Sequence, residues 1–224
     1  MNQNIAHIVT LTSMLTAIIS IIQSFNLQFS IAAYFILICF FLDGIDGAIA
    51  RRLNTTSNFG KELDSFSDFI AFGIAPGFLM YNFMNYELNY SIICYLAFII
   101  PIFSAIRLAH YNTSKYKKNF IGLTTPVSAL FFSAIPLINL SEKNDVFHQI
   151  IINPYTITIS IIIISILLIS KLPTFSIRID SLKYDKRKMM FIFISMLILF
   201  IFNFTGILAI IILYIILNRL RTIN

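Results

Sequence analysis

Long apolar runs separated by short polar stretches extend along the whole chain. Each run approaches the roughly 20 residues that a helix needs to cross a bilayer, and polar or Pro/Gly-containing breaks mark the connections. The pattern predicts an all-α protein, a polytopic membrane helical bundle with about eight transmembrane helices. We expect these helices at residues 6–23, 30–52, 60–84, 90–111, 121–140, 148–170, 187–202 and 204–221.

The composition agrees with a membrane protein. Hydrophobic residues make up 58% of the 224 residues, charged residues make up 12%, and the mean hydropathy is +0.86. These values exclude a water-soluble core of ordinary composition, so we expect one integral membrane domain, residues 1–224, surrounded by membrane lipid. The basic residues form no aromatic-interleaved motif outside the apolar runs, and nucleic acid is therefore not an expected partner.

The basic residues predict how the bundle is oriented. The chain has 16 Lys and Arg against 10 Asp and Glu. An even number of spans places both termini on one side, and with both termini in the cytoplasm only Lys143 of the 16 basic residues falls outside. Because cytoplasmic loops carry an excess of Lys and Arg, we expect cytoplasmic termini and a location in the cell inner membrane.

Four acidic residues occupy positions where a membrane helix normally carries none. Asp43, Asp46, Asp64 and Asp68 lie at or just inside the expected cytoplasmic ends of the second and third apolar helices. An isolated charge at membrane depth costs at least roughly 2.5 to 3.5 kcal/mol, so four nearby carboxylates must be paired, protonated or bound to metal. One such residue could simply face a hydrated vestibule; four favour a functional site.

The spacing of these acids predicts that they converge. Asp43 and Asp46 are three residues apart on one helix, and Asp64 and Asp68 are four apart on the next, so each pair shares a helix face. The short polar segment 51–59 allows the two faces to meet in an antiparallel hairpin. An all-oxygen set suits two hard divalent cations, Mg²⁺ or Mn²⁺, rather than zinc. Paired ions of this kind serve phosphoryl transfer.

Two glycines share the acidic faces. Gly47 follows Asp46 directly, and Gly60 precedes Asp64 by one helical turn. Because glycine lacks a side chain, a nucleotide or pyrophosphate could approach the backbone closely there. Helix packing through small residues explains the same glycines, and both interpretations remain open.

The stretch from residue 43 to residue 68, DGIDGAIARRLNTTSNFGKELDSFSD, resembles the signature of the CDP-alcohol phosphotransferase family, D-x-x-D-G-x-x-A-R-x8-G-x-x-x-D-x-x-x-D. Every fixed position of the signature is matched. The resemblance implies that Asp68 is both a metal ligand and the general base. It also implies that Gly47 and Gly60 border the cytidine nucleotide and that Arg51 lies near its phosphates. The full set of implied metal ligands is Asp43, Asp46, Asp64 and Asp68.

Three further segments are similar to membrane-embedded phosphatidylserine synthases within this family. They are LDSFSDFIAFGIAP at 63–76, AIRLAHYN at 105–112 together with IGLTTP at 121–126, and ISKLPTFSIR at 169–178. This resemblance implies transfer of the phosphatidyl group from CDP-diacylglycerol to L-serine at the cytoplasmic face, with release of CMP. It also implies a homodimer. The chain departs from the subgroup at His110, where an arginine is usual.

The carboxylate of serine requires a cationic partner, and Arg107 is the leading candidate. Lys117, Lys118 and Arg178 compete with it, and each could instead be a positively charged anchor at the membrane surface. Another acceptor, glycerol 3-phosphate or an inositol phosphate, would use the same chemistry with a denser cationic pocket. A cation-coupled transporter is the alternative from a different class, since intramembrane aspartates can bind a driving ion.

Overall fold

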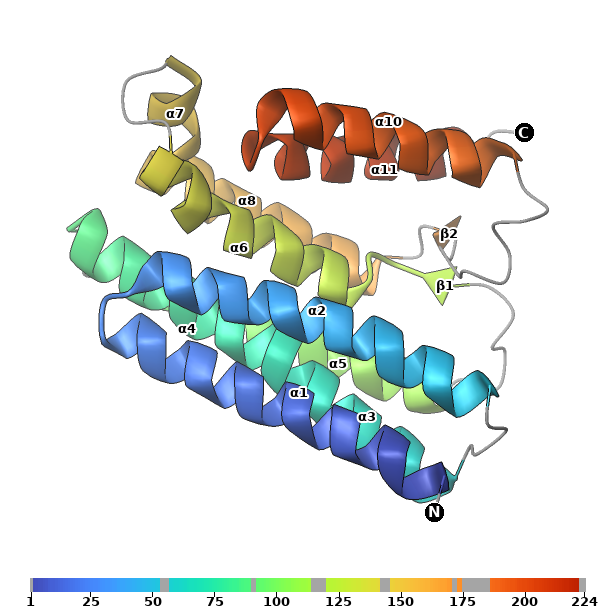
Figure 1. Ribbon diagram of the computed structural model, residues 1–224. Helices are drawn as coiled ribbons and strands as arrows, with labels where there is room; N and C mark the ends of the chain where they lie inside the picture. Colours follow the sequence, from blue (N-terminus) through green and yellow to red (C-terminus); the bar gives the residue numbers. More distant parts are fainter. Residues whose placement is uncertain are drawn as a thin grey trace.

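The computed structural model describes residues 2–52, 57–89, 92–113, 120–141, 146–170, 173–174 and 186–221. Nearly all of these residues are helical, which confirms the predicted all-α class (Figure 1). The α-helices are α1 (Asn2–Phe25), α2 (Phe29–Arg52), α3 (Asn58–Phe69), α4 (Ala75–Asn82), α5 (Ile99–Thr113), α6 (Thr125–Ser141), α7 (Val146–Ile151), α8 (Pro154–Ile169), α10 (Lys186–Phe202) and α11 (Thr205–Arg221). Shorter elements are the π-helical η1 (Ile70–Ile74) and η2 (Phe83–Glu87), the 3-10 helix η3 (Ile93–Phe98), and strands β1 (Phe120–Ile121) and β2 (Pro173–Thr174).

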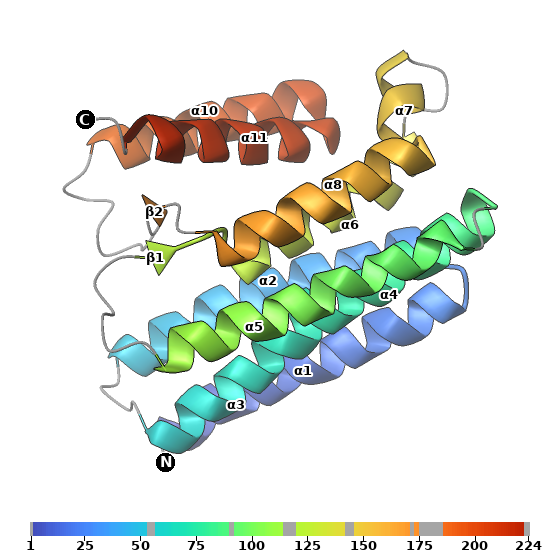
Figure 2. The ribbon, with the colours of Figure 1, turned by 180° about the vertical axis from the view of Figure 1, so that it is seen from behind.

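The helices pack side by side in an elongated bundle (Figures 1 and 2). Helix α1 packs along α2, α2 contacts α6, α8 lies along α5, and α11 contacts α6. The start of α1 and the end of α11 lie at the same end of the bundle as the junction between α2 and α3. We call this the aspartate end, and we call the opposite end, where α1 turns into α2, the far end.

The third predicted helix is continuous from Asn58 to Glu87 and contains two wide π-helical turns. The first of these, η1, follows α3 directly and is buried at Ala71, Phe72 and Gly73. A Cβ atom on Gly73 would lie 3.1 Å from the Cβ atom of Ser104. The absence of a side chain there therefore lets η1 pack closely against α5, and π-helical turns of this kind are frequent near functional sites.

The predicted helix 148–170 is in fact two helices, α7 and α8. Asn153 lies between them with extended backbone, and its side chain accepts a hydrogen bond of 2.9 Å from the backbone N–H of Tyr155. Pro154 then begins α8, because a proline in the first turn removes no helical hydrogen bond. Hydropathy did not predict this start of α8, because the residues on both sides of Asn153 are apolar.

The predicted helix 121–140 begins late, at Thr125. Gly122 has a positive φ of 81°, and a Cβ atom there would meet the Leu168 carbonyl oxygen at 2.5 Å. The Leu123 N–H donates to the Leu167 carbonyl oxygen over 2.9 Å, so the chain is held against the end of α8 before α6 starts. Beside this turn, β1 pairs antiparallel with β2, a short pair that the helical pattern did not predict.

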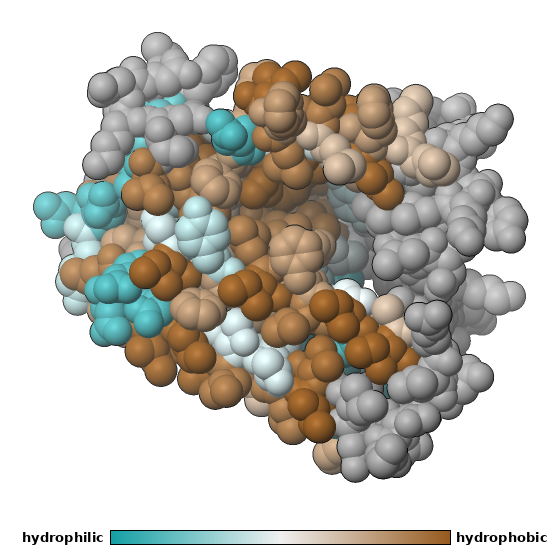
Figure 3. Space-filling view, viewed as in Figure 1, coloured by the Kyte–Doolittle hydropathy of each residue, from teal (hydrophilic) through white to brown (hydrophobic). Residues whose placement is uncertain are grey.

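The surface of the bundle confirms an integral membrane protein. Within the described residues, four helical segments are long and apolar enough to cross a membrane, namely His7–Phe25, Phe29–Ile49, Asn58–Glu87 and Ile93–Thr113. Large apolar side chains cover much of the face seen in Figure 3, and single residues such as Phe200 reach 86% exposure. An apolar patch of this extent suits lipid rather than water. The count of eight spans and the cytoplasmic termini stay predictions, because the remaining apolar helices are shorter.

Candidate active site

The acidic residues lie in the second half of α2 and in the middle and at the end of α3. The α3 helix is capped by Ser57, whose Oγ accepts a hydrogen bond of 2.9 Å from the Gly60 N–H. An N-cap of this type fixes where the first turn begins. It therefore also fixes the rotation of α3, and Asp64 and Asp68 point from one face of that helix toward α2 at the aspartate end.

Three of the four predicted ligands come together. Asp43, Asp64 and Asp68 each offer a carboxylate oxygen, and these oxygens all lie within 4.8 Å of one another. All three side chains are half-buried, and the carboxyl groups of Asp43 and Asp68 are close enough to share a hydrogen bond. Carboxylates this close repel unless a proton or a cation lies between them. Their all-oxygen donor set fits a hard divalent cation.

Asp46 is placed differently, although it lies only one turn from Asp43. Its side chain is 6% exposed and accepts a hydrogen bond of 3.1 Å from Thr10 Oγ1 on α1. It lies outside the close three-carboxylate group but within electrostatic reach of Asp43 and Asp64. The structure therefore brings all four acids to one region, with Asp46 at its buried edge.

Thr10 is a contributor that the sequence pattern did not reveal. Besides its bond to Asp46, its carbonyl oxygen accepts a hydrogen bond of 3.2 Å from Ser67 Oγ on α3. One residue of α1 thus contacts both of the helices that carry the acids. No motif marks this threonine within its apolar run, and only the packing of α1 shows its position.

The two predicted glycines lie in different surroundings, and neither of the two interpretations is settled by them. A Cβ atom on Gly60 would lie 2.8 Å from His7 Cε1 and 3.1 Å from Ser57 Oγ, so α1 packs directly over this glycine. Gly47 is half-buried, whereas nothing lies within 4 Å of the position a Cβ atom would take on the neighbouring Gly44. Arg51 ends α2 in its last turn, but its side chain falls outside the described residues. The competing cations Lys117, Lys118 and Arg178 also lie outside them.

Arg107 reaches the acids from α5. Its guanidinium interacts electrostatically with Asp68, and its Nη1 donates a long hydrogen bond of 3.4 Å to Thr125 Oγ1 on α6. The Nε atom is buried and has no hydrogen-bond partner among the described residues. Further along α5, Asn112 Nδ2 donates to Ser65 Oγ over 3.0 Å and so connects α5 to α3. A cation is thus within electrostatic range of Asp68, and its role in an acceptor site stays a prediction. His110 is exposed.

Residues 3–175 match the sequence profile of the CDP-alcohol phosphatidyltransferase family. The chain belongs to this family. The match includes α1 to α8 and therefore every element that contributes to the carboxylate cluster and to Arg107. The predicted family resemblance is thereby confirmed.

Several curated relatives are 30–40% identical to the chain over the segments that match. The CDP-diacylglycerol--serine O-phosphatidyltransferase of Helicobacter pylori strain 26695 is 38% identical over 124 residues, 54% of this chain and 52% of the relative. The protein of the same name from Methanocaldococcus jannaschii is 39% identical over 127 residues, 56% and 57% of the two chains. The archaetidylserine synthase of Methanothermobacter thermautotrophicus is 33% identical over 150 residues, 64% of each chain. The chain spans about half the length of the first two relatives.

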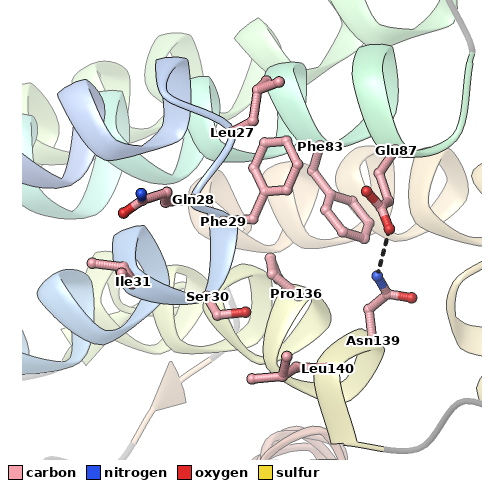
Figure 4. Close-up of a pocket in the computed structure, with 10 residues that line it drawn as sticks. All are labelled: Leu27, Gln28, Phe29, Ser30, Ile31, Phe83, Glu87, Pro136, Asn139 and Leu140. Carbon is pink, nitrogen blue, oxygen red and sulfur yellow. Dashed lines mark hydrogen bonds between the residues drawn. The ribbon is translucent and has the colours of Figure 1, made fainter.

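A cavity of this CDP-alcohol phosphatidyltransferase family member lies at the far end (Figure 4). It has a volume of about 310 Å³ and is lined by apolar residues such as Phe29 and Phe83, together with Glu87 and Asn139. Asn139 Nδ2 donates to Glu87 Oε1 over 3.1 Å. Glu87 is the one carboxylate among the residues that line this cavity. The close group of carboxylates that the family chemistry is expected to use lies instead at the aspartate end.

Proposed function

We propose that the chain transfers the phosphatidyl group from CDP-diacylglycerol to the hydroxyl of L-serine, giving phosphatidylserine and CMP. The observation that carries the proposal is the juxtaposition of the carboxylate cluster with the Arg107 guanidinium. The cluster suits the diphosphate chemistry of the family, and the cation suits an acceptor that carries a carboxylate. The names of the three relatives agree, because each of them refers to serine.

The four aspartates would hold two divalent cations, Mg²⁺ or Mn²⁺. The fit rests on three carboxylate oxygens within 4.8 Å of one another and on Asp46, one helical turn from Asp43 and held by Thr10. When bound, such ions neutralise charge on the diphosphate of the donor and on the departing CMP. Gly47, Gly60 and Arg51 would border the cytidine nucleotide.

Asp68 would act as the general base. The hydroxyl of serine has too high a pKa to ionise at neutral pH, so its proton must leave as the new bond forms. The serine oxygen forms a bond to the phosphorus on the lipid side, the bond from that phosphorus to the CMP oxygen breaks, and the proton passes to the Asp68 carboxylate. Arg107, beside Asp68, would bind the serine carboxylate and so hold the hydroxyl close to its base.

The proposal includes the setting of the enzyme. Residues 1–224 would form a single membrane domain of a homodimer in the cell inner membrane, with the aspartate end in the cytoplasm. Support for this orientation comes from the distribution of Lys and Arg, since only Lys143 of the 16 lies outside in that arrangement.

The test supplies the purified protein with CDP-diacylglycerol, Mg²⁺ or Mn²⁺, and separately L-serine, glycerol 3-phosphate or inositol phosphate, and identifies the lipid product by mass spectrometry. We expect phosphatidylserine and CMP in equal amounts, and complete loss of both products on chelation. Product formation from a phosphate-bearing acceptor in place of serine would contradict the proposal. Ion flux into proteoliposomes without CMP release would instead indicate a transporter.

A further inference from the structure

Hydroxyl side chains within the helices of this protein commonly bond to their own backbone. Ser133 Oγ donates to the Ala129 carbonyl oxygen over 2.7 Å, and Thr158, Ser160 and Ser195 bond in the same way to the carbonyl four residues earlier. This bond satisfies a hydroxyl inside a membrane without any neighbour. A buried helical hydroxyl that does not make it is therefore an exception that requires an explanation.

Three fully buried serines are such exceptions. Ser104 on α5, Ser128 on α6 and Ser165 on α8 are each 0% exposed, and none of their hydroxyl groups has a hydrogen-bond partner among the described residues. The Nε atom of Arg107 is buried and unpaired as well within this part of the chain. Leaving a buried donor unpaired destabilises a protein, so unpaired donors in one region indicate a missing partner.

The register of the helices places these donors at similar depths along the bundle. Helices α5 and α6 run in opposite directions along the bundle, and Arg107 on α5 bonds to Thr125 on α6. Three residues back from Arg107 is Ser104, and three residues forward from Thr125 is Ser128. The two serines therefore lie at one depth, a helical turn from the Arg107–Thr125 bond toward the far end.

The other elements pack against the same part of α5 and α6. Helices α5 and α6 both contact η1, and the close approach of Gly73 to Ser104 places that serine against it. Helix α8 lies along α5 and also contacts α6 (Figure 2). The bond between Leu123 N–H and the Leu167 carbonyl oxygen sets its register, which brings Ser165 to the depth of Thr125.

The chemistry of this donor group, defined as Ser104, Arg107, Ser128 and Ser165, suits an anion. A guanidinium Nε–H and three hydroxyls can all donate, and a carboxylate has two oxygens with about four acceptor positions. Donors to an ionised group form the stronger class of hydrogen bonds. Arg107 interacts electrostatically with Asp68, so the donor group lies within electrostatic range of the proposed general base.

We propose that Ser104, Ser128 and Ser165 bind the carboxylate of an amino-acid acceptor together with Arg107. This inference rests on the proposed function and deepens it, because it assigns the groups that distinguish serine from an amino alcohol without a carboxylate. The three serines are specificity-determining residues, and the hydroxyl of the acceptor is left to face Asp68.

The test compares the full-length variants S104A, S128A, S165A and the triple variant with wild type, using L-serine and 2-amino-1,3-propanediol. The second compound keeps the amine and the hydroxyl but lacks the carboxylate. We expect each single variant to raise the KM for serine about tenfold with kcat nearly kept, since a hydrogen bond to a charged group has roughly that effect. The preference in kcat/KM for serine over the diol should fall accordingly.

The matched control is S133A, which removes a buried hydroxyl of α6 that is bonded to its own helix. It should leave the KM for serine unchanged. Without serine, the melting temperatures of S104A, S128A and S165A should equal or exceed that of wild type, because each loses an unpaired polar group. If these hydroxyls had a purely structural role, the three substitutions would instead lower the melting temperature.

An unchanged KM for serine in the triple variant would overturn the inference, as would equal losses with serine and with the diol. Failure of the wild-type protein to form phosphatidylserine would refute the proposed function itself. The two failures are therefore distinguishable in one set of measurements.

Discussion

Thr10 on α1 donates a hydrogen bond of 3.1 Å to Asp46 on α2, and both side chains are almost fully buried at 5% and 6% exposure. A buried carboxylate requires such a donor, because an unsatisfied oxygen costs free energy. The bond also fixes the orientation of Asp46 beside the other acids. Thr10 thereby connects the first helix to the proposed metal site without lying in the signature.

Replacing Thr10 with valine keeps the shape of the side chain and removes the donor. We expect T10V to raise the Mg²⁺ concentration required for half-maximal activity by roughly 10-fold, because second-layer hydrogen bonds orient metal ligands. Activity titrated with Mg²⁺ and with Mn²⁺ measures this, and T10S should restore the wild-type value.

The control for that variant is T12V on the same helix. Thr12 is exposed, and its hydroxyl bonds to the Ile8 carbonyl oxygen over 2.8 Å. It should leave the metal titration unchanged. Equal titrations for T10V and wild type would show that Asp46 needs no support from α1.

Asp68 should be indispensable for turnover but not for nucleotide binding. We expect D68N to lower kcat by about 10² to 10⁴, the usual contribution of a general base, while CMP or CDP still binds. Rates of CMP release and equilibrium binding of the nucleotide give the two measurements. A variant with near wild-type turnover would remove Asp68 from the role of base.

Arg107 should determine the KM for serine. Replacing it with glutamine removes the cation beside Asp68 but keeps a polar side chain, and we expect the KM for serine to rise at least roughly tenfold. The KM for CDP-diacylglycerol should change much less. Lys61 is an exposed basic residue of α3, and K61Q is the matched control for loss of charge. An R107Q enzyme with unaltered apparent affinity for serine would refute the assignment.

Gly60 offers a test that separates packing from nucleotide recognition. In G60A the new Cβ atom would lie 2.8 Å from His7 Cε1, and overpacking of this kind typically costs about 1 to 3 kcal/mol. Removing the ring in the double variant H7A/G60A should then restore the melting temperature and activity toward the values for H7A alone. If Gly60 is required for the nucleotide instead, activity stays low in the double variant although its stability recovers.

The positions of the helices and the convergence of the aspartates could be predicted from the sequence, because both follow from patterns over a few neighbouring residues. Hydropathy determined where the apolar runs lie, and spacings of three and four residues placed Asp43, Asp64 and Asp68 on facing sides of neighbouring helices. The break before Pro154 was not predicted because the residues on both sides are equally apolar, so that only the Asn153 cap distinguishes them.

Contacts between segments that are far apart in the sequence could not be predicted from these local patterns. The bond from Thr10 to Asp46 joins residues 36 apart, and nothing in the α1 run distinguishes Thr10 from its neighbour Thr12. The same holds for Ser104 and Ser128, which look like ordinary small residues of membrane helices. Their unpaired hydroxyl groups, so far as the described residues go, become visible only once burial and partners are known.

The wide turn η1 divides one membrane helix into two parts. It changes the rotation of one part relative to the other about the helix axis. A π-helical turn takes in one residue more than an α turn, and each residue of an α-helix advances about 100° around its axis. If Ile70–Ile74 took ordinary α geometry with no residue removed, the rotation along the helix would therefore increase. The half that carries Leu79 and Met80 would then swing by about 100° relative to Asp64 and Asp68. The wide turn therefore lets Leu79 and Met80 pack in the core while Asp64 and Asp68 keep their direction toward Asp43 on α2.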